Sequence, residues 1–91
     1  ILTEPFRLVD DRLYVNVDAT NGEVICELLD YETKKPLTGL SAAENIPITG
    51  DHITKLVSWR NNDNPVNDRM VQAKFLMKHA SLYSFWLGLR E

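Results

Sequence analysis

Residues 69–89 read RMVQAKFLMKHASLYSFWLGL, and this stretch decides the fold class. Large apolar or small side chains recur at every second position in both of its halves. They are Val71, Ala73, Phe75 and Met77 in the first half, and Tyr83, Phe85, Leu87 and Leu89 in the second. A spacing of two is typical of a half-buried β-strand, because successive side chains of a strand point to opposite faces. The stretch therefore predicts two adjacent strands joined by a short polar turn.

A helix over residues 70–80 is the alternative. Ala, Met, Leu and Lys are good helix formers, and Pro65 is suited to the first turn of a helix. At ~100° per residue, however, the apolar side chains of this segment would spread around the whole helix. They are Met70, Val71, Phe75, Leu76 and Met77. The absence of a single apolar face favours strands.

The rest of the chain continues the pattern of short extended segments separated by turns. Strands are expected at residues 1–9, interrupted by Pro5, and at 12–18, 23–30 and 52–60. Asn21-Gly22 is the strongest short hairpin signal, and Ser41 to Glu44 has the spacing of a capping box that opens a single helical turn. Six or seven short strands without strand–helix alternation predict an all-β fold, an antiparallel β-sandwich or barrel formed by residues 1–91 as one domain. Together with the family resemblance given below, the pattern predicts a jelly-roll-like β-sandwich.

The same alternation predicts which side chains form the core. They are Val15, Val17, Val24, Leu28, Val57, Trp59, Phe75, Tyr83 and Phe85. The segment 23–30 is apolar on both faces, since Ile25 and Leu29 lie opposite the predicted core positions. This pattern indicates either a central strand covered on both faces or a face that another domain covers.

Composition narrows the classes of partner. The net charge is −3, and no run of basic residues is longer than Lys34-Lys35, which argues against a nucleic-acid interface. No apolar run is long enough for a transmembrane helix, and no signal peptide is apparent. The chain begins at Ile1, already within an expected strand, so we expect a piece excised from a larger protein; the family resemblance given below implies that this piece comes from the C-terminal part. The single Cys26 is in phase with core positions and is expected to be a buried thiol.

The sequence predicts no catalytic site, cofactor or metal ion in this domain. His52 and His79 lack partners at the spacing that catalysis or metal binding requires, and both are expected at the surface. The carboxylates lie at turns and strand ends, and no nucleophile-elbow, P-loop or dinucleotide motif is present. Calcium held by Asp18, Asn21 and Glu23 around the expected hairpin is the one alternative, although the spacing differs from that of an EF-hand.

Three aromatic residues are the candidate functional positions. Trp86 is out of phase with Phe85 and Leu87, Tyr14 is out of phase with its apolar neighbours, and Tyr31 lies in a polar turn. An outward aromatic ring on a sheet suits a protein interface or a sugar-binding platform, and a ring covered by a loop is the third interpretation.

Several segments, taken in order and spacing, resemble a known family over almost the whole chain. They are TEPF at 3–6, LYVNVDA at 13–19, GEV at 22–24, ELLD at 27–30, PLTGLS at 36–41, NIPITGD at 45–51, VSW at 57–59 and LYSF at 82–85. The series resembles the C-terminal β-sandwich module of bacterial glycosyl hydrolases, which are similar to invertase-like and arabinanase-like enzymes with five-bladed β-propeller catalytic domains. Trp86 departs from the family pattern, which has a basic residue at that position.

The resemblance implies a non-catalytic accessory module. In such enzymes the catalytic carboxylates belong to the propeller, so no catalytic residue is carried over to this chain. The implied partner is the catalytic domain of the same polypeptide, a glycoside hydrolase, which the module packs on and stabilises. The rival predictions are a carbohydrate-binding module with a site built on Trp86, Tyr14 or Tyr31, and a purely structural, adhesion-type sandwich.

Overall fold

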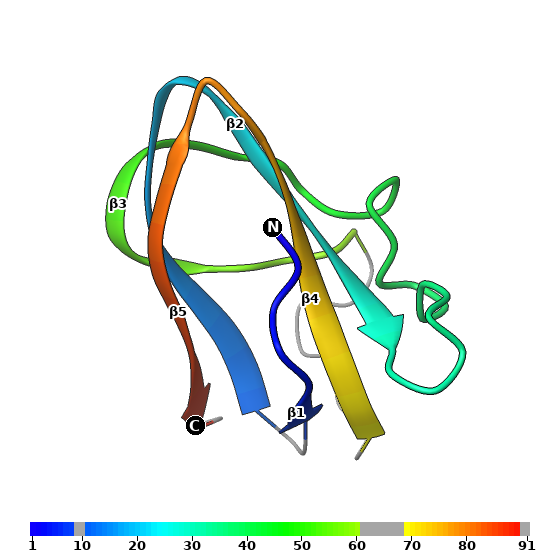
Figure 1. Ribbon diagram of the computed structural model, residues 1–91. Helices are drawn as coiled ribbons and strands as arrows, with labels where there is room; N and C mark the ends of the chain where they lie inside the picture. The colour runs from blue at the N-terminus through cyan, green and yellow to red at the C-terminus, as the bar shows by residue number, and fades with distance from the viewer. Residues whose placement is uncertain (9–10, 61–68, 90–91) are drawn as a thin grey trace.

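The computed structural model describes residues 1–8, 11–60 and 69–89, and these ranges form five strands and no helix (Figure 1). The strands are β1 (Phe6–Leu8), β2 (Asp11–Asp30), β3 (Ile48–Leu56), β4 (Arg69–Lys78) and β5 (Ser81–Leu89). All of them belong to one antiparallel sheet, which confirms the all-β class and excludes the helical alternative over residues 70–80. The described strands number five rather than six or seven, and the jelly-roll-like sandwich stays a prediction.

The long strand β2 organises the sheet, and the predicted hairpin at Asn21-Gly22 is wrong. The expected strands 12–18 and 23–30 are the two halves of one continuous strand of 20 residues. The first half pairs with β5 and the second half pairs with β4. Consequently β4 and β5 follow each other along the same edge of β2, as one long strand that bends at residues 79–80. They have the predicted residue ranges but are not hydrogen-bonded to each other as a hairpin.

Glycine is required at position 22 for a reason other than the tight turn that the hairpin signal predicts. It does not adopt a positive φ, unlike Gly39 and Gly50. A Cβ atom at residue 22 would instead overlap the backbone carbonyl oxygen of Lys78. Glycine is therefore required because two backbones approach closely where both long strands bend, and not because a tight turn demands its conformational freedom.

Both halves of the folded sheet contribute to one core. The inward side chains of β2 change phase at the bend, where the register with β3 shifts between Ala19 and Val24. They are Leu13, Val15, Val17 and Ala19 before the bend, and Val24, Cys26 and Leu28 after it. Phe85 on β5 has its ring centroid 5.9 Å from that of Phe75 on β4 and 5.9 Å from that of Phe6 on β1. The core therefore lies between two halves that face each other.

The predicted core residues lie in this core or pack against it, with the exception of Tyr83. Tyr83 is 65% exposed, so its placement in the core is wrong. The reason is an irregularity in the ladder: Asn16 pairs with Ser84 while Val17 pairs with Leu82, which leaves Tyr83 as an extra residue. Such a β-bulge reverses the phase of the strand. Leu82 takes the inward position that alternation assigns to Tyr83.

The other edge of β2 is also bonded over most of its length, which makes β2 the central strand. β3 pairs with β2 as far as Val24, and the segment that precedes β3 continues along this edge. The buried Asn45 side chain accepts a hydrogen bond from Cys26 N (2.9 Å) and donates one to Ser58 O (2.8 Å). Leu28 N then donates to Leu40 O (3.0 Å). Buried backbone donors are thus satisfied where the ladder with β3 ends.

Smaller features agree with the sequence in part. Residues 1–8 lie along the free edge of β4 with a break before Phe6, which confirms an edge strand interrupted near Pro5. The single turn predicted at Ser41 is present, since Asn45 N donates to Ser41 O (3.0 Å). β3, in contrast, begins four residues before the predicted strand at 52 and ends at Leu56.

Replacing Gly22 by alanine tests the close approach of the two backbones. We expect Gly22→Ala to lower the free energy of unfolding by at least about 2 kcal/mol, because the added methyl group forces β2 and β4 apart. The measurement is urea denaturation followed by the fluorescence of the buried Trp59. The neighbouring exposed residue supplies the control, since Asn21→Ala should change the stability by less than about 0.5 kcal/mol. Equal midpoints for the two variants would contradict this packing.

Candidate functional site

Two of the three candidate aromatic residues lie together on the outer face of the first half of β2. Tyr14 on β2 and Trp86 on β5 are directly opposite in the ladder, and they point outward because their neighbours Leu13 and Val15 point into the core. Their ring centroids are 6.1 Å apart and their planes differ by 18°. Trp86 is 37% exposed. The two rings thus form a nearly parallel pair on the surface.

Gly88 fixes the position of the Tyr14 ring. A Cβ atom at residue 88 would lie 2.5 Å from Cε2 and 2.9 Å from Cδ2 of Tyr14. The tyrosine ring therefore covers the backbone of β5 at the glycine, where any larger side chain would displace it. An aromatic ring that packs across a strand over a glycine is a known way of compensating for the missing side chain. Local alternation places Gly88 on the same face as Trp86 but does not predict its contact with Tyr14, which lies on another strand.

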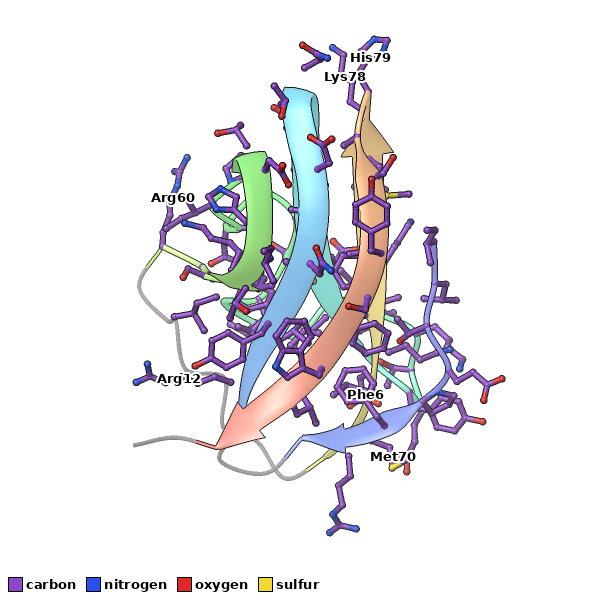
Figure 2. All side chains as sticks on the ribbon, turned by 90° about the vertical axis from the view of Figure 1, so that its left-hand side faces the viewer. Phe6, Arg12, Arg60, Met70, Lys78 and His79 are labelled. Atoms are coloured by element: carbon purple, nitrogen blue, oxygen red, sulfur yellow. The ribbon has the colours of Figure 1, made fainter. Side chains whose placement is uncertain are left out.

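Further side chains extend this surface, which Figure 2 shows from the side where the first half of β2 lies between β3 and β5. Asn16 and Ser84 form the next opposed pair of the ladder, and the bulge turns Tyr83 outward beside Ser84. We call this surface the β5 face. Its members are Tyr14, Asn16, Tyr83, Ser84 and Trp86. Tyr83 was missed as a site residue because alternation alone placed it in the core.

Tyr31 lies away from the β5 face. It follows the last residue of β2, and its backbone N–H donates to Met70 O at the start of β4 (3.0 Å). The ammonium group of Lys34 lies 3.8 Å from the centre of its ring and also donates to Gln72 Oε1 (3.0 Å). This cation–π contact occupies one side of the ring. The structure therefore does not bring Tyr31 together with Tyr14 and Trp86.

The outer face of the second half of β2 carries aliphatic rather than aromatic side chains. Ile25 is directly opposite Leu76 of β4, which is 42% exposed. Leu29 lies four residues further along β2 on the same face. It is buried and forms an isolated bridge with Pro36, so the turn that follows β2 covers that end of the face. We call the uncovered part the β4 face. It consists of Leu2, Ile25, Met70 and Leu76.

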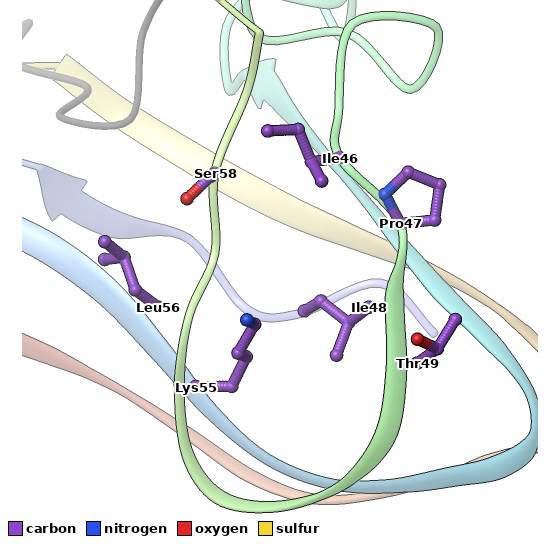
Figure 3. Close-up of a pocket in the computed structure, with 7 residues that line it drawn as sticks. All are labelled: Ile46, Pro47, Ile48, Thr49, Lys55, Leu56 and Ser58. Carbon is purple, nitrogen blue, oxygen red and sulfur yellow. The ribbon is translucent and has the colours of Figure 1, made fainter.

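A small cavity of about 230 Å³ lies between the two arms of the segment that contains β3 (Figure 3). The arms are joined at their base, where Ile46 N donates to Ser58 O (2.9 Å) and Arg60 N donates to Glu44 O (2.8 Å). The lining residues are Ile46, Pro47, Ile48, Thr49, Lys55, Leu56 and Ser58. The cavity is smaller than typical ligand pockets and holds one charged group, so it lacks paired groups for acid–base chemistry.

The remaining polar candidates are engaged locally. The alternative of a calcium site depends on a hairpin that does not form, because Asp18, Asn21 and Glu23 follow one another along β2. Asp18 accepts hydrogen bonds from the hydroxyl (2.7 Å) and the backbone N–H (3.2 Å) of Thr20, and these lower the pKa of its carboxyl group. In the part of the chain that the structure describes, no three His, Cys, Asp or Glu side chains are placed to hold a metal ion.

The two histidines differ in their surroundings. His79 is exposed at the bend between β4 and β5, as the sequence predicts, and has a φ of 50°. His52 is half-buried, and its Nε2 atom lies 2.7 Å from Thr49 O. His79 therefore belongs to the bend, and the His52 ring is in contact with a backbone carbonyl of its own strand, β3.

Comparison of the chain with protein-family models, curated proteins and solved structures found no match. Within residues 1–8, 11–60 and 69–89, no helix is long and apolar enough to cross a membrane.

Cys26 is a buried thiol, as predicted. Its side chain is fully buried between the two halves of the sheet. Burial, and to a smaller extent the charge of Glu27, raises the pKa of the thiol well above its ordinary value. The thiolate is the nucleophilic form, so both access and ionisation oppose reaction in the folded protein.

We therefore expect Cys26 to react with Ellman's reagent about 10³-fold more slowly in the native protein than in denaturant, because reaction requires opening of the sheet. The measurement is the rate of release of the coloured thiolate at neutral pH. Cys26→Ala serves as the blank. Rapid reaction without denaturant would show that β2 opens locally.

Proposed function

We propose that this chain is a non-catalytic accessory module of a glycoside hydrolase, which packs on the catalytic domain of the same polypeptide and stabilises it. The observation that carries the proposal is the cross-strand pair of Ile25 and Leu76 on the outer face of the sheet. The sequence resemblance to C-terminal modules of propeller enzymes supplies the identity of the partner.

Ile25 and Leu76 lie at an unusual position for outward-facing apolar side chains. Single exposed hydrophobic residues are common on protein surfaces and need no explanation. Here, however, β2 is bonded along both edges, so Ile25 belongs to the middle of the sheet and not to its rim. Leu2 is 53% exposed and lies opposite Lys74, one position on this face from Leu76. Met70 is 43% exposed and is separated from Leu76 on the same face by Gln72 and Lys74. A small apolar patch bordered by polar side chains suits contact with another domain.

The charges on the β4 face suit a fixed docking orientation. Glu27 and Lys74 are directly opposite each other between the Ile25 row and the Leu29 row. Opposite charges at opposed positions on a sheet attract each other weakly. Glu27 also accepts a hydrogen bond from Ala42 N (3.1 Å), which fixes its carboxylate within the chain. This charged row borders the apolar pair on one side, an arrangement of the type that orients an interface, while the apolar side chains supply most of the affinity.

The test measures binding of the separately expressed catalytic domain to this chain. We expect Leu76→Gln to weaken binding at least about tenfold, which corresponds to ~1.4 kcal/mol, because it replaces an interfacial leucine by a polar side chain of similar length. Isothermal titration calorimetry gives the affinity, and urea denaturation should show a change in the module's own stability of less than about 0.5 kcal/mol.

The matched control is Ile53→Gln, at a position on β3 that is 79% exposed and lies outside the β4 face. This variant should bind the catalytic domain as the parent chain does. An equal loss of affinity in both variants, or no loss in Leu76→Gln, would refute docking through the β4 face.

Carbohydrate binding is a second candidate function, and the nearly parallel rings of Tyr14 and Trp86 favour it. The apolar face of a sugar ring stacks on an exposed aromatic ring in the same way as other flat, partly apolar groups do. The third sequence-based interpretation, cover of these rings by a loop, accounts less well for a Trp86 that is 37% exposed.

A further inference from the structure

We propose that the β5 face binds a short, neutral oligosaccharide, with sugar rings stacked on Tyr14 and Trp86 and sugar hydroxyl groups bonded to Asn16 and Ser84. This inference rests on the carbohydrate-binding function considered above and is independent of docking through the β4 face. It adds Asn16, Tyr83 and Ser84 to the candidate residues and leaves Tyr31 out.

The aromatic pair is preorganised as a platform. Tyr14 and Trp86 are held in register by the ladder between β2 and β5, and Gly88 provides the space in which the Tyr14 ring lies. The ring centroids are 6.1 Å apart and the ring planes differ by 18°, so the two rings form a nearly parallel pair within the range of aromatic contact. Because the rings are already fixed, a ligand does not have to order them when it binds.

The polar groups beside the platform match a sugar. Asn16 and Ser84 are directly opposite each other in the row next to Tyr14 and Trp86. Asn16 is half-buried and Ser84 is exposed, and neither side chain is hydrogen-bonded to another of the described residues. An amide offers both donors and an acceptor, and a hydroxyl group offers both as well. Sugar hydroxyl groups, which also donate and accept, are the natural partners of such a pair.

The bulge in β5 completes the site with a third ring. Tyr83 is 65% exposed and lies three residues from Trp86, roughly 10 Å along the strand at ~3.3 Å per residue. The polar pair therefore lies between two aromatic positions, which suits an extended ligand that runs along β5. None of the five side chains carries a charge. The neighbouring rows of β2 on the same face carry one charge of each sign, Arg12 beyond Tyr14 and Asp18 beyond Asn16, and the Asp18 carboxylate is engaged by Thr20. A neutral saccharide is therefore favoured over an acidic one.

The experiment is a calorimetric and NMR titration of the chain with neutral cello-, xylo-, manno- and arabino-oligosaccharides, with an oligogalacturonide as the acidic comparison. We expect saturable binding of at least one neutral sugar, with amide shifts confined to β2 and β5. Trp86→Ala and Tyr83→Ala should each weaken binding at least about tenfold. Circular dichroism checks that each variant is folded. If Trp86→Ala does not fold, Tyr83→Ala still tests the site, because the Tyr83 side chain is exposed and does not belong to the core.

The control is Tyr31→Ala, which removes a ring that is 41% exposed and lies outside the β5 face, and this variant should leave binding unchanged. Gly88→Ala adds a separate readout, since it should weaken binding by displacing the Tyr14 ring while every ring and polar group is retained. Leu76→Gln should bind sugar as the parent chain does, which separates this result from the docking test. Absence of binding to every neutral sugar at millimolar concentration, binding of the acidic sugar alone, or an equal loss in Tyr31→Ala would overturn the proposal.

Discussion

The hydrogen bonding of β2 along both of its edges is the constraint on which the structure depends. A strand of 20 residues presents donors and acceptors on each side, and these must be paired wherever they are buried. β5 and β4 in succession pair with one edge, while β3, the Asn45 side chain and the segment near Leu40 pair with the other. The positions of these elements follow from that requirement.

The bend in β2 determines which faces remain for function. Folding the sheet at Gly22 places one face of each half in the common core and leaves two outer faces that differ in chemistry. The β5 face combines aromatic rings with uncharged polar groups, whereas the β4 face carries aliphatic side chains beside Glu27 and Lys74. The chain thus presents two separate outer surfaces of different chemistry.

Local alternation predicted the strands and most of the core, because the side chains on the buried face of a strand recur at every second residue. It placed Val15, Val17 and Phe75 correctly, and it pointed to Tyr14 and Trp86 as outward rings. It failed where pairing between distant strands decides the conformation. The bulge that turns Tyr83 outward and the backbone approach that requires Gly22 both depend on partners far away in the sequence, so neither leaves a local signal. The contact of Tyr14 with Gly88 was missed for the same reason.

The long ladder between β2 and β4–β5 also has a consequence for how the chain folds. Even the residues of this ladder that are nearest in sequence, Asp30 and Val71, come from opposite halves of the chain. No part of it can form as a local hairpin, so a large loop must close before the first contacts are gained. Topologies dominated by such distant pairings fold slowly. A chain that has not yet formed this ladder therefore exposes the apolar side chains of β4, which are covered only once β4 has paired with β2.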